Sequence, residues 1–308
     1  MTPPLQLRGG PVAALIQEKS QMALTMIVRE TGRVPSLATI LVGVDPSAGA
    51  YRRSIVRTLG KMAIRHVPVD LPTTLTAEEF SATLRRLNED PDITGVLVLM
   101  PLPAHLPAEL VLDHLAPLKD VDGITPTNAG RLHLGMPAIK PSTPEGGIEL
   151  LDHYGIDLTG RHVVVIGRSN VVGRPLATML TLRDATVTLC HRQTRDLGRL
   201  TRQADIVAVA AGCPGLLTHG MVRQGAVVLD FGVNVVDGSL VGDVDIPKIG
   251  HLLAAYSPVP GGAGPVTAMV LARNVIVAAY AALGERIGPP LELPAAGFGP
   301  PADSGIGD

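Results

Sequence analysis

Short apolar runs alternate with amphipathic segments along the first 115 residues of the chain. Residues 36–44 (SLATILVGV) and 95–99 (GVLVL) are typical of buried parallel strands, whereas residues 12–31 have apolar positions at helical spacing. The same alternation predicts a strand at 66–72 and helices at 47–64, 76–88 and 108–115, with Thr76 as N-cap ahead of Glu78 and Glu79. This order predicts an α/β domain with a mainly parallel sheet.

A second alternation follows a loop-rich stretch at residues 119–146. Thr143-Pro144-Glu145 predicts the start of a helix that runs to residue 154 and links two domains, because proline is favoured at the first helical position. The apolar strand His162–Ile166 then leads through a glycine-containing turn into a helix from Arg174. Further strands are predicted at 185–190, 206–210, 227–231 and 252–255. The pattern is that of a doubly wound, Rossmann-like nucleotide-binding domain.

The predicted boundaries place a catalytic domain at residues 1–142 and a nucleotide-binding domain at 143–265. A C-terminal helix at 266–285 is expected to complete the first domain, and the Pro/Gly/Ala-rich tail at 286–308 is expected to be disordered. The apolar stretch 263–283 is interrupted by Arg273 and Asn274, which favours a buried helix over a membrane span. We therefore expect two α/β domains joined by long helices, with a cleft between them.

Composition excludes several classes of protein. Aromatic residues make up 2% of the chain and the net charge is −2, so neither a base-stacking groove nor a basic field for nucleic acid or anionic lipid is expected. The two cysteines, Cys190 and Cys213, form no metal-ligand or disulfide pattern, and no metal site is predicted. The start of the chain lacks a signal-peptide pattern, so a cytoplasmic protein is expected.

The turn after His162–Ile166 is a candidate phosphate site, because glycines and a helix N-terminus expose backbone N–H groups to an anion. Ser169 stands where a full dinucleotide fingerprint has its second glycine, so an ordinary strand–helix turn remains an alternative. The next strand ends at Cys190-His191-Arg192, without the carboxylate that would hold a ribose 2′-hydroxyl. Arg168 and Arg192 favour a 2′-phosphate and hence NADP, unless they are merely solvated surface residues.

Three other features are open to two interpretations. Tyr51 shares a helix face with Ala48 and Ile55, where a core role is commoner than a catalytic one. Asp122 lies in a loop between the two halves, as a substrate ligand or as a turn residue. Residues 258–265 (PVPGGAGP) either bring backbone close to a ligand or form a tight connection.

Together these segments resemble the methylenetetrahydrofolate dehydrogenase/methenyltetrahydrofolate cyclohydrolase family. The resemblance covers roughly residues 10–285, and its pieces run in the order of the family. The matching stretches are 95–103 (GVLVLMPLP), 119–123 (KDVDG), 141–144 (PSTP), 155–175 (GIDLTGRHVVVIGRSNVVGRP), 185–191 (ATVTLCH), 240–245 (LVGDVD) and 257–267 (SPVPGGAGPVT).

The resemblance implies two activities at one cleft: NADP-dependent oxidation of 5,10-methylenetetrahydrofolate, and hydrolysis of the 5,10-methenyl product to 10-formyltetrahydrofolate. It implies that Tyr51 contacts the folate, that Asp122 binds the pterin ring, and that the chain forms a homodimer through its nucleotide domain. Pro260, Gly261 and Gly262 would line the substrate site. The implied cofactor-binding residues are Gly167, Arg168, Ser169, Val172, Gly173, His191 and Arg192.

The chain departs from the family at three polar positions. Ile55 stands where the family has a catalytic Lys, Leu99 where it has the Gln that bonds this Lys, and Ala48 where Ser is common. Paired loss can be close to neutral for folding, whereas loss of the Lys alone would leave a buried amide unpartnered, so Ile55 and Leu99 are expected to pack together.

We therefore expect the dehydrogenase to survive and the cyclohydrolase to be lost or severely reduced. The alternatives are a working bifunctional enzyme with rebuilt proton chemistry, an oxidoreductase with a shifted substrate, and a non-catalytic folate- or NADP-binding protein.

Overall fold

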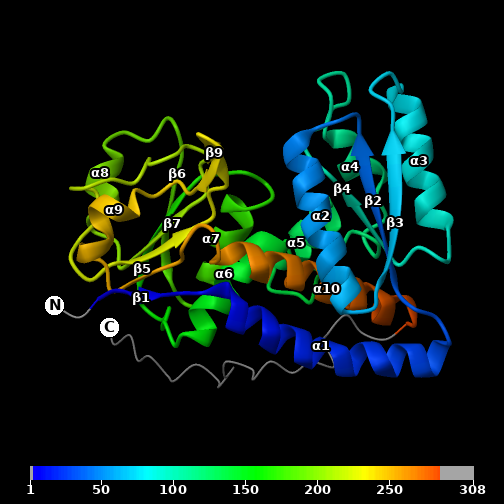
Figure 1. The fold of residues 1–308 in the computed structure, drawn as a ribbon, viewed down its shortest axis with the longest axis horizontal. Coiled ribbons are helices and arrows are strands. Elements are labelled where there is room, and N and C mark those ends of the chain that lie inside the picture. Colours follow the sequence, from blue (N-terminus) through cyan, green and yellow to red (C-terminus); the bar gives the residue numbers. More distant parts are fainter. Residues whose placement is uncertain (1–2, 285–308) are drawn as a thin grey trace, which may run out of the picture.

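The computed structural model describes residues 3–284. Its N-terminal half is built on a three-stranded parallel sheet in the order β3-β2-β4 (Figure 1). The strands are β2 (Ser36–Val42), β3 (Arg65–Leu71) and β4 (Gly95–Val98), and the helices between and after them are α2 (Pro46–Lys61), α3 (Ala77–Glu89) and α4 (Glu109–His114). The predicted strands and helices of this half are confirmed.

Thr76 caps α3 as predicted. Its hydroxyl accepts a hydrogen bond from the backbone N–H of Glu79 at 3.2 Å, and the Glu79 carboxylate accepts one from the backbone N–H of Thr76 at 2.7 Å. This reciprocal pair is a capping box, so the local sequence alone fixes where the helix begins.

The C-terminal half contains a six-stranded sheet in the order β1-β11-β8-β7-β5-β6, in which every pairing is parallel. Its strands are β1 (Leu5–Gln6), β5 (His162–Ile166), β6 (Thr186–Cys190), β7 (Ile206–Val209), β8 (Val227–Asp230) and β11 (Ala255–Tyr256). Its helices are α7 (Gly173–Thr181), α8 (Leu197–Thr201), α9 (Ile246–Ile249) and the 3₁₀ turn Gly250–Leu252. The expected doubly wound nucleotide-binding fold is confirmed.

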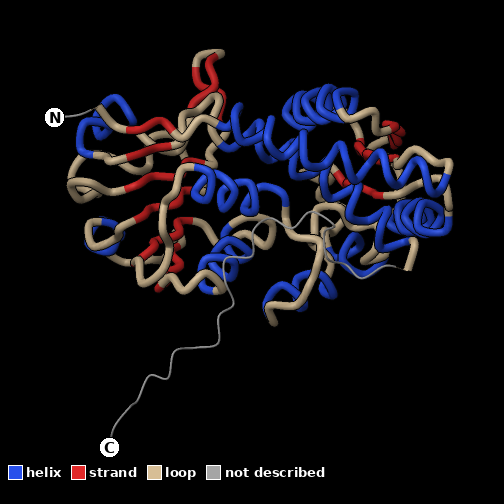
Figure 2. Tube along the Cα trace, turned by 90° about the horizontal axis from the view of Figure 1, so that it is seen from below, coloured by secondary structure: helices blue, strands red, loops and turns tan. Residues whose placement is uncertain are grey.

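Three helices connect the two groups of strands: α1 (Gly9–Thr31), α6 (Ser142–His153) and α10 (Ala263–Ala282). In Figure 1, α6 lies between the two groups, and α1 and α10 run on beneath the three-stranded sheet; Figure 2 shows the same molecule from below. Among the described residues, α10 is long and apolar enough to cross a membrane, but most of it is buried inside the protein. It packs against α1, α2 and α6, as expected of a core helix.

The structure corrects the expectation for the first residues. Residues 1–142 were all assigned to the catalytic domain, yet β1 pairs with β11 and forms one edge of the nucleotide-domain sheet. Backbone hydrogen bonds from Leu5 to Ala254 (2.9 Å) and from Leu7 to Tyr256 (2.8 Å) hold it there. A two-residue strand has no measurable hydrophobic period, so its long-range partner was not predictable from pattern.

Three other elements differ from the sequence expectation. The loop-rich stretch 119–146 contains α5 (Pro126–His133), which begins at a Thr125-Pro126 pair. An antiparallel hairpin of β9 (Asn234–Val236) and β10 (Ser239–Val241) was not predicted. The strand predicted at 252–255 begins at Ala255, because residues 250–252 form the 3₁₀ turn instead. The tail 286–308 lies outside the described residues.

Candidate active site and cofactor crevice

The structure brings Tyr51 and Asp122 together, although 71 positions separate them in the sequence (122 − 51 = 71). Tyr51 lies on α2, whose start is fixed by Asp45: its carboxylate accepts a hydrogen bond from the backbone N–H of Ala48 at 2.7 Å. Ser142, at the start of α6, donates its hydroxyl to Asp122 Oδ1 at 2.9 Å. Ser142 lies in the PSTP segment that contributes to the family resemblance, but the sequence alone predicted no role for its side chain.

Both titratable groups of this cluster have a raised pKa. Burial raises the pKa of the Asp122 carboxyl to about 6, the hydrogen bond from Ser142 opposes the rise, and the charge of Asp120 adds to it. Burial, followed by the negative charge of Asp122, also raises the pKa of the Tyr51 hydroxyl well above its usual range. Although the residue as a whole is partly exposed, the hydroxyl end is the part turned toward Asp122 and Ser142. The site therefore offers a carboxyl that titrates near pH 6 beside a neutral phenol.

The neighbouring Asp120 orders the loop that carries Asp122. It is completely buried, and its Oδ2 accepts hydrogen bonds from the backbone N–H of Thr125 (2.8 Å), the Thr125 hydroxyl (2.7 Å) and the Asn128 amide (2.9 Å). These bonds also fix the start of α5. The Thr-Pro pair that begins α5 was the available signal for this helix, since it resembles the Thr-Pro pair that predicted α6.

The positions of the expected catalytic Lys and its Gln partner are core positions in this chain. Ile55 is 1% exposed and Leu99 is 2% exposed, and both belong to the same hydrophobic cluster as Ala48 and Val121. The expectation that the two side chains are accommodated together in the apolar interior is consistent with this cluster. Neither position offers a group that can bind or transfer a proton.

The cations near Ile55 on α2 are directed elsewhere. Arg52 forms an ion pair with Asp70 on β3, and Arg53, Arg57 and Lys61 are exposed to solvent. None of these four side chains takes the place of the missing lysine.

The turn between β5 and α7 is shaped by two close backbone approaches. Gly167 has φ +120°, and a Cβ there would lie 2.2 Å from the carbonyl oxygen of Ala210. A Cβ on Gly173 would lie 1.9 Å from the carbonyl oxygen of Gly167, so both positions need glycine. Ser169, at the place of the second fingerprint glycine, accepts hydrogen bonds from the backbone N–H groups of Val172 (3.1 Å) and Gly173 (3.4 Å). The serine thus organises the start of α7.

This turn lies at the point where the order of the sheet reverses. β5 has β6 on one side and β7 on the other, and in such sheets ligands bind beyond the carboxyl ends of the strands at this point. Arg168 follows β5, and His191 and Arg192 follow β6. Both arginines are exposed, and within residues 3–284 neither takes part in an ion pair. Two unpaired cations beside a helix N-terminus suit a ligand that carries several phosphates.

The loop after β7 is fixed by a buried carboxylate that sequence reasoning did not single out. Asp243 accepts hydrogen bonds from the backbone N–H groups of Ala211 (2.7 Å), Gly212 (2.8 Å) and Cys213 (2.8 Å). Asp230 in turn accepts a hydrogen bond from the backbone N–H of Asp243 at 3.0 Å. Burial raises the pKa of Asp230 to about 6, and the charge of Asp243 adds to the rise. The pair therefore holds the loop after β7 in place from inside the protein.

Residues 258–262 form a tight connection between β11 and α10. The carbonyl of Gly261 accepts a hydrogen bond from the backbone N–H of Gly9 at 2.8 Å, and a Cβ on Gly9 would lie 2.0 Å from the carbonyl oxygen of Gly262. These contacts tie the start of α1 to the start of α10. Contact of Pro260, Gly261 and Gly262 with a substrate stays a prediction.

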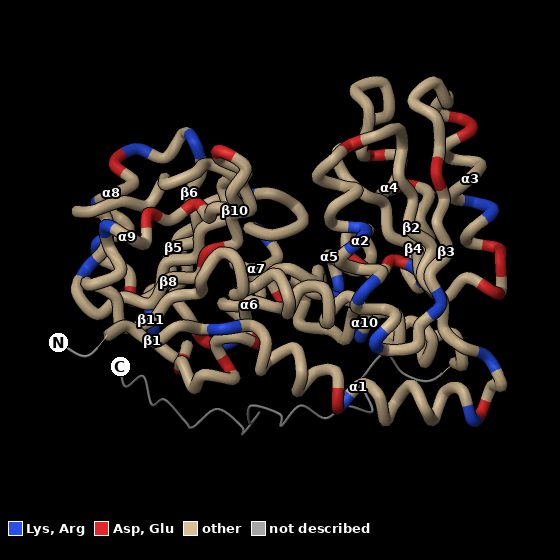
Figure 3. The backbone as a smooth tube through the Cα atoms, viewed as in Figure 1, with Lys and Arg blue, Asp and Glu red and all other residues tan. Residues whose placement is uncertain are grey.

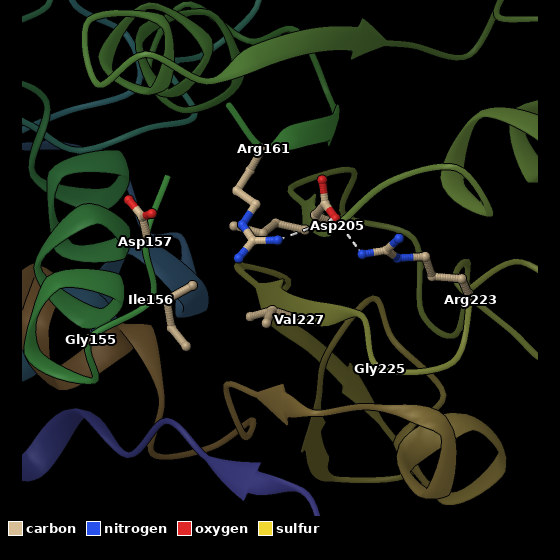
Figure 4. Close-up of a pocket in the computed structure, with 9 residues that line it drawn as sticks. Gly155, Ile156, Asp157, Arg161, Asp205, Arg223, Gly225 and Val227 are labelled. Carbon is tan, nitrogen blue, oxygen red and sulfur yellow. Dashed lines mark hydrogen bonds and ion pairs between the residues drawn. The ribbon is translucent and has the colours of Figure 1, made fainter. Parts of the chain in front are cut away.

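A pocket of about 250 Å³ lies at the opposite edge of this sheet, beside the amino ends of β5, β7 and β8 (Figure 4). Asp205 lies between Arg223 and Arg161, with Arg161 at 3.9 Å, and the backbone N–H of His162 donates to it at 2.8 Å. This hydrogen bond and the two arginines hold the pKa of Asp205 below its usual range. Both arginines of the pocket are therefore paired with Asp205, whereas Asp157 accepts a hydrogen bond from the backbone N–H of Thr159 at 3.1 Å. Along the described chain, acidic and basic positions occur in both halves of the molecule (Figure 3).

Comparison with known proteins agrees with this geometry. The relatives include a protein named bifunctional protein FolD from Thermomicrobium roseum, 48% identical over 270 residues that cover 88% of this chain and 93% of the relative. The crystal structure of the bifunctional methylenetetrahydrofolate dehydrogenase/cyclohydrolase FolD from Campylobacter jejuni superposes with a TM-score of 0.86 at 40% identity, covering 90% of this chain and 99% of that one. The Trypanosoma brucei dehydrogenase-cyclohydrolase, solved with NADP cofactor and inhibitor, gives a TM-score of 0.88 at 34% identity, covering 92% and 100%.

Two family models together match most of the chain. Residues 7–122 match the catalytic domain, and residues 141–283 match the NAD(P)-binding domain, of tetrahydrofolate dehydrogenase/cyclohydrolase. The chain is therefore a member of the tetrahydrofolate dehydrogenase/cyclohydrolase family.

Proposed function

We propose that this enzyme oxidises 5,10-methylenetetrahydrofolate to 5,10-methenyltetrahydrofolate with NADP, and that it hydrolyses the methenyl product poorly. One observation carries the second half of the proposal. Ile55 and Leu99 fill the positions of the family Lys and Gln, and both are buried in the hydrophobic core.

The cofactor crevice suits NADP, which supplies the hydride acceptor when bound. Gly167, Ser169 and Gly173 shape the turn that presents backbone N–H groups to phosphate, and Val172 precedes the first residue of α7. Arg168 and Arg192 hold the 2′-phosphate, and His191 lies beside them at the end of β6. Such a crevice contributes to the reaction mainly by holding the nicotinamide against the donor carbon.

The folate site comprises Tyr51 and Asp122, with Ser142 orienting the carboxylate and Pro260, Gly261 and Gly262 along its edge. Hydride transfer produces a cationic product and needs alignment of the two reactants rather than a proton donor. Hydrolysis of the methenyl group needs a residue that manages protons at the attacking water and the ring nitrogen. Removing such a residue typically lowers the rate by ~10²–10⁴-fold, so the two reactions are affected differently by Ile55 and Leu99.

The test is an assay in which NADPH and the methenyl species are followed separately with purified protein and 5,10-methylenetetrahydrofolate. We expect NADPH to form while methenyltetrahydrofolate accumulates and decays at its spontaneous rate. Enzymatic hydrolysis well above that rate contradicts the proposed loss of cyclohydrolase. Absence of NADPH formation, in a protein that still binds NADP, contradicts the proposed dehydrogenase.

A fully bifunctional enzyme is the second candidate, and one observation favours it. Asp122 has a pKa raised to about 6 and lies beside Tyr51, so it is a titratable group within the site that could accept a proton from water. The relatives themselves are named as bifunctional proteins. In this case an Asp122→Asn variant would lose hydrolysis and the wild type would not accumulate methenyltetrahydrofolate.

Binding of the folate is expected to weaken as the pH falls through about 6. An ionised Asp122 accepts hydrogen bonds from pterin N–H groups, whereas a protonated one loses acceptor capacity, and its pKa is raised to about 6. Between pH 7 and pH 5 the KM for methylenetetrahydrofolate should therefore rise about tenfold at saturating NADP. Tyr51 stays protonated throughout, because its pKa is shifted upward. Asp122→Asn should bind more weakly and show no such pH dependence; an unchanged pH profile in that variant would mean that another group titrates.

We also propose that the enzyme is a cytoplasmic homodimer that associates through its nucleotide domain. The β9–β10 hairpin supports this arrangement, because Val235 (70%) and Leu240 are exposed on it and Val233 (71%) is exposed directly before β9. Apolar side chains grouped on a protruding hairpin are typical of a protein–protein contact.

A further inference from the structure

One side chain of α10 holds both backbone segments that form the proposed folate site. Asn274 is 3% exposed, and its amide nitrogen donates hydrogen bonds to the carbonyl oxygens of Val121 and Lys140, each at 2.9 Å. Val121 directly precedes Asp122, and Lys140 lies two residues before Ser142. The two amide hydrogens of one residue thus connect the segment that carries the carboxylate to the segment that carries its hydroxyl partner.

The two segments are in backbone contact at the same place. Gly123 has φ +61°, and a Cβ there would lie 2.5 Å from the carbonyl oxygen of Ile139 and 2.9 Å from the backbone nitrogen of Pro141. The hydrogen bond between Ser142 and Asp122 closes the contact on the side of the folate site. Asn274 closes it on the side of the core, so Asn274 and the pair of Ser142 and Asp122 lie on opposite sides of one backbone contact.

The adjacent residue anchors this turn of α10 to α6. Arg273 is buried and forms ion pairs with Glu145 (3.1 Å) and Glu149 (2.5 Å), both on the helix that begins with Ser142. One turn of α10 therefore fixes both the loop of Asp122 and the helix of Ser142. Without Asn274, the buried carbonyl of Val121 and the partly buried carbonyl of Lys140 would lose this donor, and the contact between the two segments would be weakened.

We infer that Asn274 is a positioning residue for the folate substrate: by holding Val121 and Lys140 it sets the geometry of Asp122 and Ser142 without touching the ligand. The inference rests on the proposed folate-binding role of Asp122. It places a determinant of folate affinity on the C-terminal helix, inside the protein and away from the nucleotide turn.

The test is the variant Asn274→Leu, which keeps the approximate size of the side chain and removes both donors. We expect its KM for 5,10-methylenetetrahydrofolate to rise about tenfold, with the KM for NADP changed by less than about twofold. Asn274→Ser leaves room for a water molecule between the two carbonyls, so its KM for 5,10-methylenetetrahydrofolate should rise less. This variant replaces Asn274→Leu in the test if the leucine variant does not fold.

The matched control is Ile276→Ala, which removes a buried side chain from the same helix without touching either carbonyl. It should lower the Tm while leaving the KM for the folate unchanged. If Asn274→Leu and Ile276→Ala have the same folate KM, Asn274 is only a structural residue and the inference is wrong.

Calorimetric titration of tetrahydrofolate without NADP separates this inference from the proposed function. If the wild type binds tetrahydrofolate but oxidises no methylenetetrahydrofolate, the proposed dehydrogenase activity is wrong. The inference about Asn274 is then tested by binding alone, and it requires that Asn274→Leu bind tetrahydrofolate about tenfold more weakly than Ile276→Ala. A wild type that binds no tetrahydrofolate overturns both.

Discussion

The double variant Ile55→Lys/Leu99→Gln is expected to hydrolyse methenyltetrahydrofolate about 10²–10⁴-fold faster than the wild type. Ile55 lies one helical turn after Tyr51 on α2, so a lysine there points from the same helix face as the phenol. The glutamine at position 99 supplies the amide that a buried ammonium needs, which is why the two changes belong together. The measurement is the decay of methenyltetrahydrofolate, corrected for the spontaneous rate.

Each of the two single variants should be less stable than the double variant. Leu99→Gln alone buries an amide without a partner, at a cost of about 1–3 kcal/mol, and Ile55→Lys alone buries an unpaired charge. Ile55→Met/Leu99→Met, which changes both side chains and adds no polar group, is the matched control and should gain no hydrolysis. A folded double variant without hydrolysis would mean that more than these two side chains was missing, Ala48 being the next position to restore.

Replacing both Arg168 and Arg192 by alanine is expected to raise the KM for NADP by about 10–100-fold. Both guanidinium groups are exposed and have no ion-pair partner in the described part of the chain, so their charge is available to a 2′-phosphate. NAD lacks that phosphate, and its KM should stay within about twofold of the wild-type value. The ratio of the two KM values is the measurement.

Arg174→Ala is the control for a general loss of positive charge near the crevice. Arg174 is the second residue of α7, directly after the turn that carries Arg168, and it donates to the side chain of Asn170 at 3.0 Å. It should leave the preference for NADP over NAD unchanged. Equal increases in the KM for both cofactors in the Arg168/Arg192 variant would place the two arginines at a phosphate shared by NADP and NAD.

The sequence pattern predicted the elements that carry their own signals. Buried strands such as His162–Ile166 and the capped helix α3 were placed to within one or two residues, because local burial and capping decide them. The two-residue β1 was missed because only its contact with β11 makes it a strand. The hairpin β9–β10 was missed for the related reason that its exposed apolar residues give no core-facing period.

Some parts of the candidate site could likewise be predicted from the sequence, and others could not. The phosphate turn at Gly167 and the unpaired arginines could be argued from residues, since local backbone geometry and charge determine them. The expectation that Tyr51 and Asp122 both bind the folate came from the family resemblance, because no local pattern relates a helix residue and a loop residue so far apart. Ser142 acts through a hydrogen bond to the distant carboxylate of Asp122, and Asp243 and Asn274 act through hydrogen bonds with distant backbone groups. Such bonds leave no periodic trace in the sequence.

The chain passes between its two sheets along α1, along α6 and again along α10. A single flexible linker would let two domains rotate freely, whereas three packed helices allow opening only if they bend or slide together. The start of α10 is tied to α1 through Gly9 and Gly261, and its later turns are tied to α6 through Arg273. We therefore expect the two halves to open only by small shear movements of this helical layer, not by free rotation about a hinge.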